Sequence, residues 1–279
     1  LTTPAYSGLS EQIKESQNVQ MLNPLSQDLS VLRQSMLYSG LESVSYNINR
    51  KRSDLKLFEF GKTYHDFNGS RVENKHLSIF ISGNRNAERW NSVSARTDFF
   101  LLKGVIQSIF QRFGIENLKP SAVKSDVFSE GLIFSSAKNN LVSFGVIRKK
   151  VLKHFDIEQE VLYADINWDA LLDVVKSRKT NFSAIPKYPA VRRDFALLLN
   201  NNISYDQIEE IALKTEKKLL KEVDLFDVYQ GKNLPEGKKS YAVSFKFQDE
   251  HKTLTDKQVD KMMKKLQQSF EEELKAELR

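Results

Sequence analysis

Two runs of alternating residues, 223–229 and 239–247, place the strongest constraint on the fold of this chain. Side chains alternate between the two faces of a β-strand, so each run predicts a strand with one apolar face. In the first run we expect Phe226 and Val228 to lie in the core. In the second run, Tyr241 and every second residue after it are apolar, which predicts a buried face there as well. The two runs together predict neighbouring strands of an antiparallel sheet.

The opposite face of these two strands is a candidate nucleic-acid-binding surface. It would present Asp227 and Tyr229 from the first strand and Ser240 from the start of the second. The basic loop between the strands is expected to carry three lysines, namely Lys232, Lys238 and Lys239. An aromatic ring on an open sheet can stack on an unpaired base, and nearby lysines can reach phosphates. The alternative is an ordinary solvated face of an antiparallel sheet.

The segments around these strands complete a familiar order of elements. A strand is expected at 193–199, and Ser204 with Gln207 forms a capping box that begins a helix. Thr255 begins a second helix in the same way, and 276–278 can form a short final strand. The order strand–helix–strand–strand–helix–strand is the ferredoxin-like arrangement, which places both helices on one face of the sheet and leaves the other open.

The preceding part of the chain mixes helices and strands without a regular alternation. Apolar spacing predicts helices at 29–47, 98–113 and 168–176, and strands at 54–61, 76–83, 141–147 and 161–166. This mixture indicates an α+β domain around a largely antiparallel sheet. We expect Trp90 and Trp168 to be packing residues within it.

A chain of 279 residues is long enough for two domains of ordinary size. The stretch 176–181 is polar, and Pro186 and Pro189 follow it. We therefore place a linker there and expect domains at 1–178 and 182–279.

The composition excludes several kinds of chemistry. Without cysteine the chain has no disulfide, thiolate nucleophile or cysteine-based zinc site. The four histidines are scattered, and neither a phosphate-binding glycine loop nor a nucleophile-elbow motif is present, so we expect no metal site and no catalytic site. No apolar run approaches the ~18 residues of a membrane span and no signal-peptide pattern is present, so we expect a cytoplasmic protein with no membrane partner.

The net charge of +6 lies mainly in the N-terminal part. From residue 182 to the end, 18 lysines and arginines face 17 acidic residues, which leaves a net charge of +1. If this part binds RNA, it must use local groups such as the lysines named above rather than a general attraction for phosphates.

Six stretches, taken in order, carry a resemblance to a known family. They are LNPLS at 22–26, LFEFG at 57–61, DFFLLKG at 98–104, PAVRRD at 189–194, FDVYQG at 226–231 and LPEGKKS at 234–240. Across nearly the whole chain they resemble the C-terminal part of the bacterial phenylalanyl-tRNA synthetase beta subunit. The resemblance implies a class II synthetase-like antiparallel-sheet domain that lacks activity, followed by a ferredoxin-fold anticodon-binding domain.

The residues agree with an inactive first domain. In active class II domains the matching strand leads into an aromatic-Arg-x-Glu sequence, whose arginine binds the ATP phosphate. Here His65 stands in place of that arginine and Phe67 in place of the glutamate. A neutral imidazole cannot make the bidentate contact that a guanidinium makes with a phosphate. We expect no catalytic residue and no cofactor in this chain, with ATP and magnesium bound only in the holoenzyme.

The resemblance also implies roles and partners for the second domain. In the family, the tyrosine that matches Tyr229 stacks on the first anticodon base, and the residues that match Asp227 and Ser240 lie at the edge of that base. The implied partners are phenylalanine tRNA and the catalytic alpha subunit, in an alpha2beta2 assembly. Two alternatives are a stand-alone class II synthetase-like ligase and a ferredoxin-like protein-interaction module that does not bind RNA.

Overall fold

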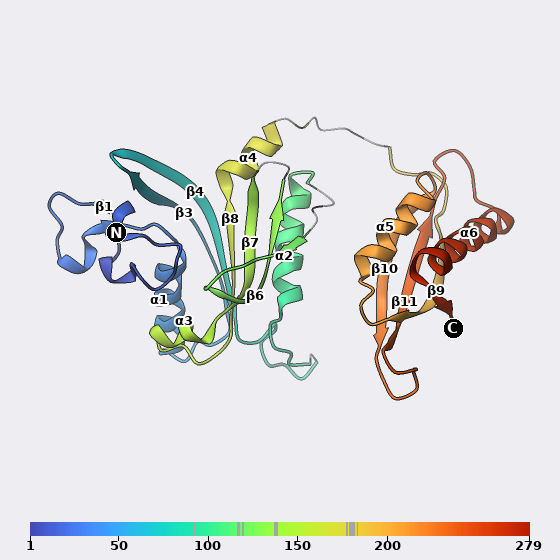
Figure 1. The fold of residues 1–279 in the computed structure, drawn as a ribbon, viewed down its shortest axis with the longest axis horizontal. Helices are drawn as coiled ribbons and strands as arrows, with labels where there is room; N and C mark the ends of the chain where they lie inside the picture. Colours follow the sequence, from blue (N-terminus) through green and yellow to red (C-terminus); the bar gives the residue numbers. More distant parts are fainter. Residues whose placement is uncertain are drawn as a thin grey trace. The chain divides into compact units, whose positions relative to one another are not determined.

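The computed structural model describes residues 1–91, 93–115, 118, 120–136, 139–176, 178, 182 and 184–279. The chain forms two compact units, Leu1–Thr180 and Asn181–Arg279, which we call unit 1 and unit 2 (Figure 1). Most of the linker predicted at 176–181 lies outside the described residues.

Unit 1 is built on a six-stranded antiparallel sheet, which confirms the predicted α+β class. In spatial order its strands are β3 (Leu55–Phe67), β4 (Ser70–Ser82), β8 (Val161–Asn167), β7 (Asn140–Ile147), β6 (Phe128–Ser135) and β5 (Pro120–Ala122). β3 and β4 are longer than predicted and form one hairpin, because Asn68 and Gly69 make a two-residue turn with φ values of 55° and 93°. Asparagine and glycine tolerate positive φ at both turn positions, and such turns match the twist of the flanking strands.

Helices cover both faces of the unit 1 sheet (Figure 1). One face packs against α1 (Leu37–Ile48) and α3 (Lys149–His154), and the other against α2 (Phe99–Arg112) and α4 (Trp168–Lys176). Strand β4 contributes to both cores because its side chains alternate. Phe80 lies in the α1 core, whereas Ile79 and Ile81 lie in the α2 core.

The segment before α1 consists of short elements rather than a long helix. They are the 3-10 helices η1 (Pro4–Tyr6), η2 (Glu15–Gln17) and η3 (Gln27–Leu29), and a two-stranded sheet of β1 (Val19–Gln20) and β2 (Val31–Leu32). The prediction of a helix at 29–47 is therefore wrong in its first turns. Leu29 ends η3 and Leu32 pairs with Val19, so these apolar residues belong to other elements despite their helical spacing.

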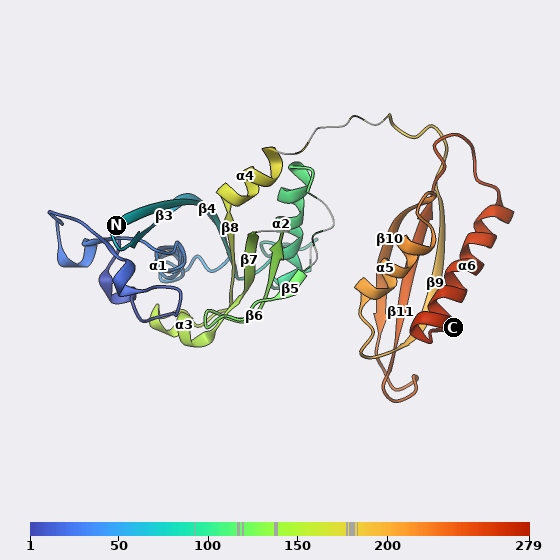
Figure 2. The ribbon, with the colours of Figure 1, turned by 45° about the horizontal axis from the view of Figure 1, so that its top comes forward.

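Unit 2 has the predicted ferredoxin-like order of elements. They are β9 (Val191–Asn200), α5 (Tyr205–Thr215), β10 (Leu220–Tyr229), β11 (Lys238–Phe247), α6 (Asp256–Leu274) and β12 (Glu277–Leu278). The strands form an antiparallel sheet in the spatial order β10-β11-β9-β12. Both helices pack on one face of this sheet, and their arrangement can be followed in Figure 2.

The helix starts of unit 2 are set by local sequence. Both predicted capping boxes are present: the backbone N–H of Ser204 donates to Gln207, and that of Thr255 donates to Gln258. Each box satisfies backbone N–H groups that a helix end otherwise leaves without a partner. The residues at the N-termini of α5 and α6 therefore determine where each helix begins.

The two tryptophans differ from each other. Trp168 packs edge-on against the rings of Phe60 and Phe113, with centroid distances of 4.8 and 5.6 Å, so it is a packing residue as predicted. The same prediction is wrong for Trp90, which lies in the loop before α2 and is almost fully exposed.

Among the described residues, no helix has both the length and the apolar character that crossing a membrane requires.

Candidate nucleic-acid interface

The open face of the unit 2 sheet is defined by strand alternation. Tyr241, Val243, Phe245 and Phe247 of β11 are buried in the core under α5 and α6. Their neighbours along the strand therefore point to the opposite face. These neighbours are small at the centre of the sheet, namely Ser240, Ala242 and Ser244. The centre of the open face is consequently shallow, because its β11 side chains are shorter than the neighbouring side chains of β10.

Strand pairing brings the three predicted base-contacting residues together. Tyr229 lies directly opposite Ser240, and Asp227 lies opposite Ala242, in the register of β10 and β11. Directly opposed residues project from the same face of an antiparallel pair. Asp227, Tyr229 and Ser240 therefore share the open face, where Tyr229 is 39% exposed and Ser240, beside it, only 8%. Their assignment to a nucleotide stays a prediction.

Gly231 helps to place the ring of Tyr229, a role that the sequence did not reveal. A Cβ atom at position 231 would lie 2.5 Å from the Tyr229 hydroxyl oxygen and 2.7 Å from the ring carbon that bears it. A side chain larger than that of glycine at position 231 would therefore push the phenol away from its present place. This close approach joins a loop backbone to a side-chain ring. The periodicity of the sequence, which reveals strands and helices, cannot predict such a contact.

The lysines lie differently from the prediction. Lys238 and Lys239 begin β11 and are not part of the loop. Lys239 is only 6% exposed and places its Nζ atom 4.5 Å from the ring centroid of Tyr241, on the helix side of the sheet, so it cannot reach a phosphate on the open face. Lys238 is ion-paired with Glu277 of β12. Lys232 is exposed in the loop, as predicted.

A β-bulge changes the predicted faces of β10. The expectation that Phe226 and Val228 are buried is wrong, since they are 50% and 49% exposed. Leu225 pairs with Val243 and Asp227 pairs with the adjacent Ala242, so Phe226 is an extra residue without a partner on β11. An inserted residue breaks the period of two on which the sequence prediction depended. Val228 lies opposite Tyr241 on the helix side, near the end of the strand.

His65 of unit 1, which we predicted to stand in place of an ATP-binding arginine, is a histidine whose pKa is lowered. Partial burial, followed by the charge of nearby His76, lowers the pKa of His65 from its ordinary value. Its ring lies nearly parallel to that of Phe67, with centroids 5.9 Å apart. An imidazole in this setting favours the neutral form, which is unsuited to holding a phosphate.

A polar cluster lies beside His65 on the same sheet. His76 Nδ1 is 2.8 Å from Asp165 Oδ1, and its Nε2 is 3.1 Å from Thr63 Oγ1. The order hydroxyl–imidazole–carboxylate resembles a nucleophile triad, but Thr63 is buried and its oxygen is out of reach of a substrate. Within the described ranges no group of three or more His, Asp or Glu side chains is arranged to hold a metal ion.

An apolar groove runs between strand β3 and helix α2 in unit 1. It has a volume of about 500 Å³, and its lining includes Phe58, Phe60, Leu101, Val105 and Ile109. Phe58 and Phe60 are more than half exposed. An exposed apolar surface of this kind is typical of a site for a protein partner.

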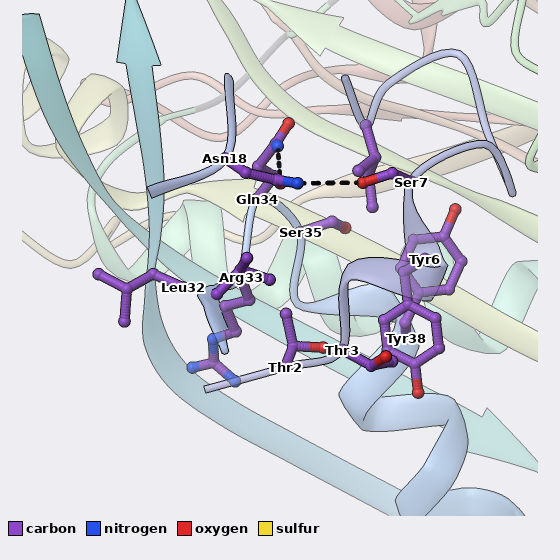
Figure 3. A pocket seen from close by; sticks show the side chains of 12 residues that line it. Thr2, Thr3, Tyr6, Ser7, Asn18, Leu32, Arg33, Gln34, Ser35 and Tyr38 are labelled. Atoms are coloured by element: carbon purple, nitrogen blue, oxygen red, sulfur yellow. Dashed lines mark hydrogen bonds between the residues drawn. The ribbon is translucent and has the colours of Figure 1, made fainter. Parts of the chain in front are cut away.

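The small cavity shown in Figure 3 is structural. It lies among residues of the N-terminal segment and holds only about 10 Å³, which is at most enough for a single water. Gln34 donates to Asn18 over 2.6 Å, and Asn18 donates to Ser7 over 3.3 Å (Figure 3). These bonds fasten the N-terminal segment to the strand end before α1.

Comparison with known proteins places the chain in a family. Residues 1–168 match the family model described as phenylalanyl tRNA synthetase beta chain CLM domain, and residues 186–279 match the ferredoxin-fold anticodon binding domain. The chain belongs to the phenylalanyl-tRNA synthetase beta chain family.

Similar curated proteins carry the corresponding name. The phenylalanine–tRNA ligase beta subunit of Bacteroides thetaiotaomicron is 45% identical over 291 residues, covering 100% of this chain and 36% of that protein. That of Porphyromonas gingivalis is 39% identical over 286 residues, covering 98% and 35%. This chain thus spans about a third of the length of these relatives.

Among solved structures, the pyrrolysyl-tRNA synthetase of Desulfitobacterium hafniense matches with a TM-score of 0.43 at 17% identity, covering 58% of this chain and 54% of that one. This likeness is too distant to carry an argument.

Proposed function

We propose that this chain acts within a cytoplasmic phenylalanine–tRNA ligase, where unit 2 holds the anticodon of phenylalanine tRNA and unit 1 packs against the catalytic alpha subunit. The observation that carries the RNA part is the placement of Tyr229, Asp227 and Ser240 on one open sheet face. The match of residues 186–279 to an anticodon-binding domain supports the same assignment.

Each of the three side chains has a task in this proposal. The ring of Tyr229 stacks on the first anticodon base, which in phenylalanine tRNA is guanine. The carboxylate of Asp227 accepts hydrogen bonds from the N–H groups of the guanine Watson–Crick edge, and a charged acceptor strengthens them. Ser240 borders the same base and provides a hydroxyl beside it. Stacking supplies affinity for any base, whereas the carboxylate supplies the preference for guanine.

Phosphate contacts in this proposal come from the edge of the site. Lys232 is the exposed lysine of the loop that follows Tyr229. Lys238 is partly neutralised by Glu277, and Lys239 lies on the other face of the sheet. In this proposal the site therefore binds RNA mainly through the Tyr229 ring and the Asp227 carboxylate, and attraction between lysines and phosphates contributes little.

Equilibrium binding of two tRNAs tests the RNA part. The intact 279-residue chain is titrated with phenylalanine tRNA and with the same tRNA carrying a different first anticodon base, at one salt concentration. Tighter binding of the unaltered tRNA is expected, because only guanine presents two N–H donors to Asp227. Equal binding of both tRNAs contradicts anticodon recognition by this chain.

The scaffolding part rests on the apolar groove between β3 and α2. A surface with exposed phenylalanines resembles one side of a stable subunit interface, which is more hydrophobic than ordinary surface. The relatives are named beta subunits, and we propose that the alpha subunit of the same ligase covers this groove in an alpha2beta2 assembly. The alpha subunit would then bind ATP and magnesium, and His65 would take no part in holding the phosphates.

Association with the alpha subunit tests this part. The chain is mixed with that subunit and the mass of the complex is measured by light scattering, for the parent, for Phe58→Ser and for the control Trp90→Ser. We expect Phe58→Ser to weaken association and the control, an exposed aromatic residue outside the groove, to leave it unchanged. A chain that fails to associate at all contradicts the scaffolding role. Phenylalanine-dependent pyrophosphate exchange by the chain alone would favour a stand-alone ligase instead.

A further inference from the structure

The β-bulge on β10 places a second aromatic side chain on the open face of unit 2. Phe226 is the inserted residue, and it is absent from the core formed with α5 and α6. Its ring lies 5.0 Å from the Cζ atom of Arg192 on β9. Arg192 pairs in register with Lys246, which neighbours the buried Phe247 and so projects from the open face. Phe226 is therefore turned toward the same face as Tyr229.

Arg192 is held in this position by a neighbouring carboxylate. Its Nε atom donates to Asp194 Oδ1 over 2.8 Å, which orients the guanidinium over the Phe226 ring, and the Arg192 side chain stays 57% exposed. Guanidinium planes and aromatic rings both stack on nucleic-acid bases. Phe226 and Arg192 together make a half-exposed patch, which we call the Phe226 platform.

The charges around the platform favour a base over a phosphate. The hydrogen bond to Asp194, together with the charges of Asp224 and Glu222, raises the pKa of Arg192. These three acidic residues lie around one arginine, and Lys246 is ion-paired with Glu222. A phosphate would meet more negative than positive charge here, whereas the neutral ring of a base would not be repelled.

The spacing suits a second base of the same strand. Phe226 lies three positions before Tyr229, which at ~3.3 Å per residue is about 10 Å along β10. Small side chains of β11 border the space between the two rings on the open face. Four-stranded sheets that bind single-stranded RNA stack two or three successive bases on such aromatic positions.

We propose that the Phe226 platform stacks on an unpaired base next to the first anticodon base, so that the open face of unit 2 holds two bases of one RNA loop. This inference rests on the proposed function, because it needs the Tyr229 site to place the RNA. The platform adds affinity with little dependence on base identity or on salt, since stacking uses the face of a ring and no phosphate.

The test uses three β10 variants of the 279-residue chain, with Tyr229→Ala as a fourth for reference, and an anticodon stem-loop of phenylalanine tRNA. Phe226→Leu keeps an apolar cover over the bulge but removes the aromatic face, and Phe226→Tyr restores the face. Val228→Ala is the matched control, because Val228 is exposed to the same extent but lies on the helix side. We expect Phe226→Leu to weaken binding roughly 5- to 150-fold, with Phe226→Tyr and Val228→Ala near the parent.

A fluorescent base locates the contact. 2-Aminopurine is placed on one side or the other of the first anticodon base, and its quenching by the chain is measured. Quenching at one of these positions that Phe226→Leu abolishes is the expected result. If Phe226→Leu binds and quenches like the parent while Tyr229→Ala binds weakly, the proposal that the Phe226 platform stacks on a base is overturned and the proposed function stands. If Tyr229→Ala also binds like the parent, both are overturned.

Discussion

Tyr229 and Ser240 lie directly opposite each other on β10 and β11, on the sheet face that α5 and α6 leave open. Because opposed residues of an antiparallel pair are nearest neighbours, a base stacked on the Tyr229 ring would lie next to the Ser240 hydroxyl. Asp227, two residues before Tyr229 on the same face, then lies within the reach of the base edge. The register of β10 and β11 therefore brings together Tyr229, which we propose supplies affinity, and Asp227, which we propose supplies specificity.

Asp227→Asn should reduce discrimination more than affinity. The amide keeps the size of the carboxylate but loses the charge that strengthens hydrogen bonds to guanine. We expect the preference for the guanine-containing anticodon to fall roughly 5-fold or more, corresponding to about 1 kcal/mol or more. Binding constants for the natural and the anticodon-swapped tRNA provide the ratio. An unchanged ratio would show that Asp227 does not contact the discriminating edge.

Lys232→Ala should weaken the binding of cognate and swapped tRNA by the same factor. Loss of one phosphate contact also reduces the slope of log K against log salt, by about 0.7 for single-stranded RNA. Lys239→Ala is the matched control, because Lys239 is buried over Tyr241 on the other face. Equal salt slopes for Lys232→Ala and the parent would mean that this lysine contacts no phosphate.

Gly231→Ala should disturb the site while leaving unit 2 folded. The added methyl would lie 2.5 Å from the Tyr229 hydroxyl, so the ring must turn away from the place where it now lies. A phenol on the surface can move at low cost, so we expect weaker RNA binding with a nearly unchanged melting temperature. Titration with phenylalanine tRNA and thermal unfolding measure the two effects. Parent-like binding by the variant would show that Gly231 does not position the ring.

The fold of unit 2 was predictable because its local signals agree. The capping boxes at Ser204 and Thr255, the alternation in β11 and the apolar stripe of α6 each specify an element, and the order of elements then limits the topology. The register that joins Tyr229 to Ser240 comes from the pairing of two alternating strands across the loop 230–237. The sequence thus predicted which of the site residues share a face.

The errors arise where a tertiary contact overrides a local pattern. The bulge at Phe226 follows from pairing between β10 and β11, and alternation alone cannot reveal an unpaired residue. Lys239 was assigned to a loop, whereas pairing with Leu199 makes it a strand residue facing the helices. Leu29 has the spacing of a helix but ends η3 instead.

His65 should make the stability of the chain depend on pH. Burial lowers the pKa of its imidazole in the folded state, so the unfolded chain binds a proton more readily. Stability is therefore lost as pH falls from the ordinary histidine pKa of about 6.5 toward the lower folded value. His65→Asn should reduce this loss in thermal unfolding, whereas His251→Asn, at an exposed site, serves as the control. Parallel curves for His65→Asn and the parent would contradict the assignment.

Binding of phenylalanine tRNA by Tyr229→Ala tests the central claim most directly. Loss of one stacked base costs ~1–3 kcal/mol, so the dissociation constant should rise roughly 5- to 150-fold at matched salt. Tyr229→Phe keeps the ring and should bind like the parent, which separates stacking from the hydroxyl. If folded Tyr229→Ala binds the tRNA as tightly as the parent, the open face of unit 2 does not hold the anticodon.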